Sequence, residues 1–96
     1  MLTSKQRSHL RSLANKLDAI FRIGKDGVTP ELTQAIDDAL TARELIKISV
    51  LENCPNEPNE AAELLEGRTR SDVVQVIGKK IVLYRTSKKK LIELPK

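Results

Sequence analysis

The sequence predicts one α/β domain of the two-layer, α+β-like kind, with helices packed on a mixed, mostly four-stranded sheet. Three observations predict it. Apolar residues recur at helical spacing in three segments, strand-forming runs lie between and after them, and a glycine-lysine turn separates the last two runs. The order is a helix, then strand-helix-strand-helix-strand-strand. Alternating strands and helices favour a mostly parallel sheet, to which the final hairpin adds an antiparallel pair.

The first helix begins after Thr3, which can cap it together with Gln6 in a capping box. We expect this helix to end near residue 16 or 17. Its apolar face is formed by Gln6, Leu10, Leu13, Ala14 and Leu17. A separate polar face carries Lys5, His9, Ser12 and Lys16.

Residues 19–23 are rich in strand formers, with Phe21 and Ile23 on one side and Ile20 and Arg22 on the other. The glycines at the ends of loop 24–27 stop this strand.

A second helix begins at Thr29, which can cap it, while Pro30 suits the first helical position and Glu31 complements the helix dipole. This helix should run to about residue 42, and residues 45–51 should form the second strand.

Two prolines make residues 53–58 a loop, after which Asn59 can cap a third helix that Gly67 ends. Residues 73–77 and 81–84 predict a hairpin around 78–80, and a basic loop over 87–90 leads to a short terminal strand at 91–94.

The chain of 96 residues predicts a single domain spanning 1–96, since its length leaves no room for a second core. It has no apolar run long enough to cross a membrane and no signal-peptide pattern at its start. Its one cysteine, Cys54, excludes an internal disulfide and favours a reducing compartment. We therefore expect a cytoplasmic protein that does not bind membranes, with a monomer as the default.

Charge is segregated along the chain. Residues 1–26 carry six lysines and arginines against two acids, residues 27–66 carry two against nine, and residues 67–96 carry nine against two. If the two basic ends meet in the fold, they form a positive face that suits a polyanion. Solubility is an equally good explanation of this charge pattern.

The loop Gly24, Lys25, Asp26 and Gly27 is the strongest candidate site. Glycine lets the backbone approach a phosphate closely, and exposed N–H groups can donate to its oxygens. Lys25 adds a mobile charge, Arg22 a guanidinium fork, and the helix start at Thr29 further N–H groups. Spacing alone favours a plain tight turn instead, because glycine marks turns more often than phosphate sites.

Further candidates are Lys79 and Lys80 at the hairpin tip, and Lys5 and Lys16 on the first helix. For each lysine alone, solvated surface charge is the commoner explanation. His9 and Cys54 have no partners at metal-ligand or catalytic spacing, so we expect no enzymatic activity, no metal and no cofactor.

Five motifs occur in the order typical of one known family. They are residues 10–14 (LRSLA), 21–29 (FRIGKDGVT), 44–48 (ELIKI), 74–78 (VQVIG) and 81–85 (IVLYR). In this the chain resembles the CRM (chloroplast RNA splicing and ribosome maturation) domain in its stand-alone bacterial, YhbY-like form. One departure is Ala19, where many relatives have a proline.

The resemblance implies a fold similar to the C-terminal domain of translation initiation factor three. It also implies RNA binding through the GxxG loop, Gly24 to Gly27, with ribosomal RNA of a large-subunit precursor as the partner. The chain itself has only two large aromatic residues, Phe21 and Tyr84, both in strand patterns that suggest burial. We therefore expect recognition of RNA backbone and shape, with little base stacking.

An alternative is a protein-interaction module that docks through the acidic middle segment. It would use exposed acids such as Asp37 and Asp38.

Overall fold

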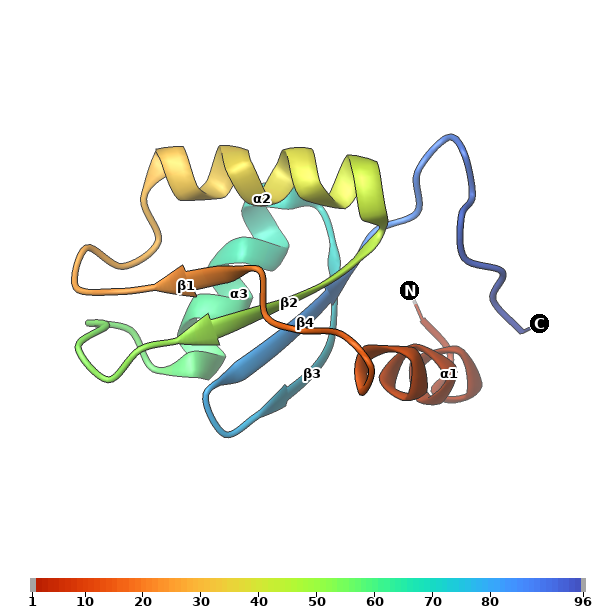
Figure 1. Cartoon of the computed structure of the whole chain (residues 1–96), viewed down its shortest axis with the longest axis horizontal. Helices are drawn as coiled ribbons and strands as arrows, with labels where there is room; N and C mark the ends of the chain where they lie inside the picture. Colours follow the sequence, from red (N-terminus) through yellow and green to blue (C-terminus); the bar gives the residue numbers. More distant parts are fainter. Residues whose placement is uncertain (1, 96) are drawn as a thin grey trace.

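The computed structural model describes residues 2–95, and Figure 1 shows the path of the chain. Over these residues the predicted order of three helices and four strands is confirmed. The elements are α1 (Ser4–Ala14), β1 (Phe21–Ile23), α2 (Pro30–Arg43), β2 (Leu45–Val50), α3 (Pro58–Thr69), β3 (Asp72–Ile77) and β4 (Lys80–Tyr84). The predicted α/β class with a mixed four-stranded sheet is confirmed as well.

The strands lie in the order β1-β2-β4-β3. β1 pairs with β2 in parallel, whereas β4 is antiparallel to both β2 and β3. The expectation of a mostly parallel sheet is therefore wrong, because two of the three strand pairs are antiparallel. The reason is that β4 lies between β2 and β3, which run in the same direction. Since β1, β2 and β3 end where β4 begins, loop 24–27 and the β3–β4 turn lie at one end of the sheet, which we call the loop end.

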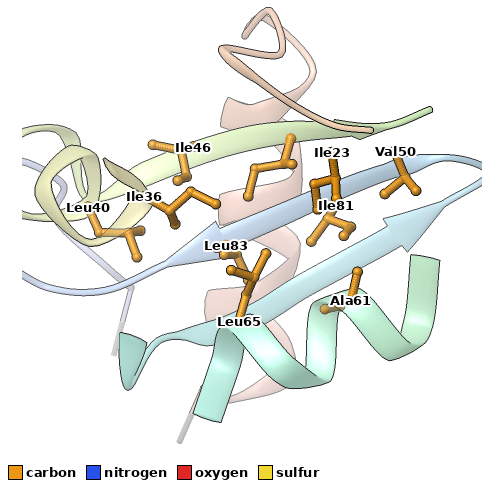
Figure 2. Packing of buried hydrophobic residues seen from close by; sticks show 11 residues of the cluster. Ile23, Ile36, Leu40, Ile46, Val50, Ala61, Leu65, Ile81 and Leu83 are labelled. Atoms are coloured by element: carbon orange, nitrogen blue, oxygen red, sulfur yellow. The ribbon is translucent and has the colours of Figure 1, made fainter. Parts of the chain in front are cut away.

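One face of the sheet packs against α2 and α3 and holds the main core. Ile46 and Ile48 of β2 and Ile81 and Leu83 of β4 are fully or almost fully buried there. Figure 2 shows Leu65 and Ala61 pointing from α3 toward these strands. Strands and helices thus form the predicted two layers, and the alternation of β2 between apolar and polar residues sets which side chains enter the core.

The opposite face of the sheet is only partly covered. Leu10 and Ala14 of α1 are buried against Leu45, Val82 and Tyr84, where β2 begins and β4 ends. Figure 1 shows α1 at the right of the view and loop 24–27 at the far left. Because α1 covers only the end remote from the loop, the loop end of this face stays open.

The two ends of the chain meet beside α1. Thr3 and Gln6 form the predicted capping box, and the Gln6 side chain also donates 3.0 Å to the carbonyl oxygen of Pro95. Ile92 and Leu94 pack against the same apolar cluster as α1. The terminal segments that carry most of the basic residues therefore lie side by side.

Three predicted helix ends were displaced. α1 ends at Ala14, short of the expected residue 16 or 17, and Asn15 caps it. α3 begins at Pro58 with Glu57 as its cap, whereas the sequence predicted Asn59 as the cap. Proline suits the first position of a helix, so the helix begins two residues before the predicted start. Gly67 does not end this helix, since Arg70 adopts the left-handed conformation that terminates it.

The free edge of β3 is engaged by side chains from two helices. The Arg7 guanidinium donates to the carbonyl oxygens of Val73 and Val74, and the Glu66 carboxylate accepts the N–H of Val73 at 3.0 Å. The pairing register slips between Val73 and Gln75, which marks a β-bulge. Both helices are thereby fastened to the strand at its irregular point.

Segment 91–94 forms no strand, contrary to the prediction, because a buried carboxylate holds this part of the chain instead. Glu44 accepts the N–H and the hydroxyl of Ser87 at 2.7 and 2.5 Å, and the N–H of Ile92 at 2.9 Å. Burial raises the pKa of Glu44, but these hydrogen bonds outweigh it, so the pKa lies below its ordinary value. The contribution of this group to stability is therefore complete above the pKa of an unfolded glutamate and is lost as pH falls through the lower folded value.

We expect Glu44→Gln to lower the free energy of unfolding by about 1–3 kcal/mol, because one buried N–H loses its acceptor. At least one of the amides of Ser87 and Ile92 should exchange faster with solvent, while those of β2 and β4 keep their protection. Urea unfolding and amide exchange measure both effects. Wild-type exchange rates at both amides in the variant would contradict the anchoring role.

Candidate nucleic-acid interface

A hollow at the loop end of the sheet brings together six residues that the sequence singled out. Its volume is about 560 Å³, which is in the usual range for ligand sites. It is lined by Arg22, Gly24, Lys25, Asp26, Gly27 and Thr29, together with Leu32 and Asn53. Strand β1, loop 24–27 and the start of α2 therefore form one concave surface.

Gly27 has a structural role in shaping this loop. Its N–H donates 3.0 Å to the carbonyl oxygen of Gly24, which closes a tight turn. Its φ of 68° favours glycine, and a Cβ there would lie 3.0 Å from Asn56 Oδ1 and 3.2 Å from Pro55 Cγ. Gly27 thus allows loop 24–27 to pack closely on loop 53–58.

Gly24 is under no such constraint. It does not have a positive φ, and a Cβ there would meet Leu51 and Asn53 at 3.8 and 3.9 Å, which is ordinary contact. The fold therefore tolerates a side chain at position 24.

Fewer N–H groups are free than the sequence suggested. The N–H of Gly27 is used within the turn, Pro30 has none, and Leu32 donates its N–H to Thr29 Oγ1 at 3.1 Å. Within residues 2–95, the N–H groups of Lys25 and Asp26 have no acceptor. In that range the start of α2 adds only the N–H of Glu31, which also has no acceptor, so the helix offers one free amide and not a row of them.

Asn53 is the lining residue that the sequence did not reveal. It comes from the loop after β2, and its exposed side chain reaches the rim of the hollow beside Gly24. Asparagine in a proline-containing loop is usual, so only the parallel pairing of β1 with β2 shows that this loop adjoins loop 24–27.

The hairpin lysines lie at the same end of the sheet but face different neighbours. Lys80 Nζ donates 3.1 Å to Ser49 Oγ across the strands, whereas Lys79 Nζ pairs with a Glu52 carboxylate oxygen at 3.3 Å. The charge of Lys79 is therefore partly offset by its partner, although an exposed pair of this kind contributes little to stability.

The two lysines predicted near the first helix do not line the hollow. Lys5 lies in the first turn of α1, whose contacts are at the opposite end of the sheet from the loop. Lys16 lies in the turn that follows α1. Their contact with RNA stays a prediction that requires an RNA long enough to reach around the domain.

Part of the acidic middle segment is engaged inside the fold. Arg85 pairs with the Asp37 carboxylate at 2.6 Å and also donates to Thr69 O at 2.7 Å and Thr41 Oγ1 at 2.8 Å. Arg85, which follows β4, therefore joins Asp37 and Thr41 of α2 to the end of α3. Reversing its charge would test folding as well as docking, so Asp38 is the better probe of the alternative hypothesis.

Among residues 2–95, no group of three or more His, Cys, Asp or Glu side chains could hold a metal ion. In that same range no helix is both long and apolar enough to cross a membrane.

The CRS1/YhbY (CRM) domain model matches residues 2–85 of the chain, which is most of its length. The chain belongs to this CRM family. Its five ordered motifs thus identified the family correctly, and the second of them, residues 21–29, contains the loop that lines the hollow.

Similar proteins of comparable length are known. A Bacillus subtilis protein named "Probable RNA-binding protein YqeI" is 53% identical over 96 residues, covering 99% of this chain and all of the relative. A Haemophilus influenzae protein named "RNA-binding protein" is 33% identical and covers 99% of this chain and 96% of its own. The solution structure of Staphylococcus aureus SAV1595 is 54% identical, with a TM-score of 0.83 over 99% of this chain and all of that one.

The two glycines of the loop should respond differently to alanine. We expect Gly27→Ala to lower the free energy of unfolding by about 1–2 kcal/mol or more, since it adds strain at positive φ and contact with Pro55. Gly24→Ala should change it by less than about 0.5 kcal/mol. Urea unfolding of the two variants checks this, and equal losses at both positions would contradict the division of roles.

Proposed function

We infer that this protein binds RNA and that the hollow at the loop end of the sheet holds a phosphate of the RNA backbone. The observation that carries this inference is that Arg22 and loop 24–27 line one concave surface, in a loop where the N–H groups of Lys25 and Asp26 have no acceptor among residues 2–95. The names of similar proteins, which refer to RNA binding, support it.

The chemistry of the hollow suits a phosphate diester. Backbone N–H groups donate to non-bridging oxygens, as in other GxxG loops that clamp nucleotides, and Arg22 offers a planar fork that matches two such oxygens. Lys25 adds a point charge on a flexible stem. The ionised Asp26 carboxylate has no proton to donate to a phosphate and is repelled by its charge, so we expect it to face a sugar hydroxyl or solvent.

Base stacking contributes little in this proposal. Tyr84 is buried beneath α1, and Phe21 packs against the main core, so neither ring is on the open face of the sheet. Proteins that read single-stranded bases on a sheet use aromatic platforms. Recognition through backbone and shape follows, with little dependence on base sequence.

The proposed target is ribosomal RNA within a precursor of the large ribosomal subunit, as the family resemblance implies. Crosslinking in cells followed by sequencing of the bound RNA tests this target. Recovery of a discrete site in large-subunit RNA supports it, whereas recovery of scattered RNAs in proportion to their abundance would overturn it.

The role of the loop is tested separately with Lys25→Glu. We expect this variant to lose RNA affinity by about tenfold or more, since one charged contact is removed and a repulsive one is added. The loss should be similar for hairpins of different sequence, because phosphate contacts carry no base information. Fluorescence anisotropy with labelled RNA hairpins measures it.

Lys88→Glu is the matched control, because Lys88 is exposed in the segment after β4, remote from the loop end. It makes the same change in net charge. Equal loss of affinity in both variants, with both folded, would show that net charge and not the loop determines binding.

A further inference from the structure

The open part of the sheet face carries a row of side chains that spans all four strands. Strand register places Arg22 of β1 beside Ser49 of β2, Ser49 beside Lys80 of β4, and Lys80 beside Ile77 of β3. We call these four residues the cross-strand row. They lie on the face opposite the main core, beyond the part that α1 covers.

The row is continuous with the hollow. Arg22 both lines the hollow and begins the row, so no other element separates the two surfaces. Ser49 holds the Lys80 ammonium across the sheet at 3.1 Å. Two strand spacings, about 10 Å, separate the backbones of Arg22 and Lys80, so the two cations can serve different phosphates of one strand.

Lys47 adds a third cation to this face. It lies on β2 two residues before Ser49, on the same side, and pairs in register with Val82. Its side chain is half-buried, so packing restrains the aliphatic part while the ammonium stays at the surface. Among the described residues 2–95, Asp72 is the only acidic strand residue on this face. It pairs with Tyr84 at the other end of the sheet.

Apolar surface accompanies the charge. Ile77 at the end of the row is 61% exposed, and Ile20 before β1 is 41% exposed. Cations that alternate with exposed aliphatic side chains suit a ligand with charged phosphates and less polar sugars and bases.

We propose that the RNA strand held in the hollow continues across the open sheet face, with phosphate contacts to Arg22, Lys47 and Lys80. This proposal rests on the proposed RNA function. It adds Lys47 to the candidate residues, places the earlier candidate Lys80 on the same face, and gives the RNA a path from loop 24–27 over β2 to β4. An acidic protein segment is the competing occupant, and RNA is favoured because the row leads without a break out of the hollow that we propose to hold a phosphate.

The test measures the affinity of the full chain for a fluorescein-labelled oligouridylate of about ten nucleotides at several salt concentrations. Four variants are compared: Lys47→Gln, Lys80→Gln, Lys25→Gln for the loop, and Lys89→Gln as a charge-matched control after β4. Loss of one phosphate contact in single-stranded RNA lowers the slope of log affinity against log salt by about 0.7. Thermal unfolding verifies that each variant is folded.

We expect Lys47→Gln and Lys80→Gln each to weaken binding by about three- to tenfold and to lower the slope, as Lys25→Gln does, while Lys89→Gln keeps the wild-type slope. Wild-type slopes for Lys47→Gln and Lys80→Gln, with a lowered slope for Lys25→Gln, would overturn the sheet path and leave the loop function intact. No measurable RNA binding by the wild-type chain would instead refute the proposed function.

Two further outcomes count against the proposal. If Lys89→Gln lowers the slope as much as Lys80→Gln, the binding is diffuse attraction to a basic domain. If polyglutamate of similar length binds as tightly, with the same dependence on Lys47 and Lys80, the face is a docking surface for acidic protein.

Discussion

The arrangement of the protein depends on the central strands β2 and β4, because one face of these strands packs against the main core and the other is partly open to solvent. On one face Ile46, Ile48, Ile81 and Leu83 are sealed beneath α2 and α3. A slip of one residue would place Lys47 in the core, and burying an unpaired ammonium there is far too costly. The register is therefore fixed by hydrophobic burial. The same register places the cations of β1, β2 and β4 on the open face.

Within loop 24–27, Gly27 is required for the shape of the loop, whereas Gly24 is not. Gly27 is buried and strained for any other residue, and it uses its own N–H to close the turn. The turn leaves the N–H groups of Lys25 and Asp26, two residues that line the hollow, without an acceptor in the described part of the chain. The loop therefore has a fixed shape without a ligand, which would reduce the entropy cost of the proposed phosphate binding.

Local signals in the sequence were sufficient for most of the fold. The capping box at Thr3, the proline start of α2 and the glycine-lysine hairpin each act within a few residues, so pattern analysis found them. Features that depend on strand order escaped it. Asn53 enters the hollow only because β2 lies beside β1, and the cross-strand row requires β4 to insert between β2 and β3. The anchoring of segment 85–92 by Glu44 likewise joins residues more than 40 positions apart.

The fastening of the β3 edge by Arg7 and Glu66 has a consequence for the behaviour of the protein at high concentration. An uncovered strand edge is a template on which another molecule can add its own strand and begin an aggregate. Here two carbonyl oxygens and one N–H of that edge already have partners, and the bulge bends the strand between them. Only the stretch from Gln75 to Ile77 is left, which is shorter than the usual strand. Edge-to-edge polymerisation through β3 is thereby disfavoured, even at high protein concentration.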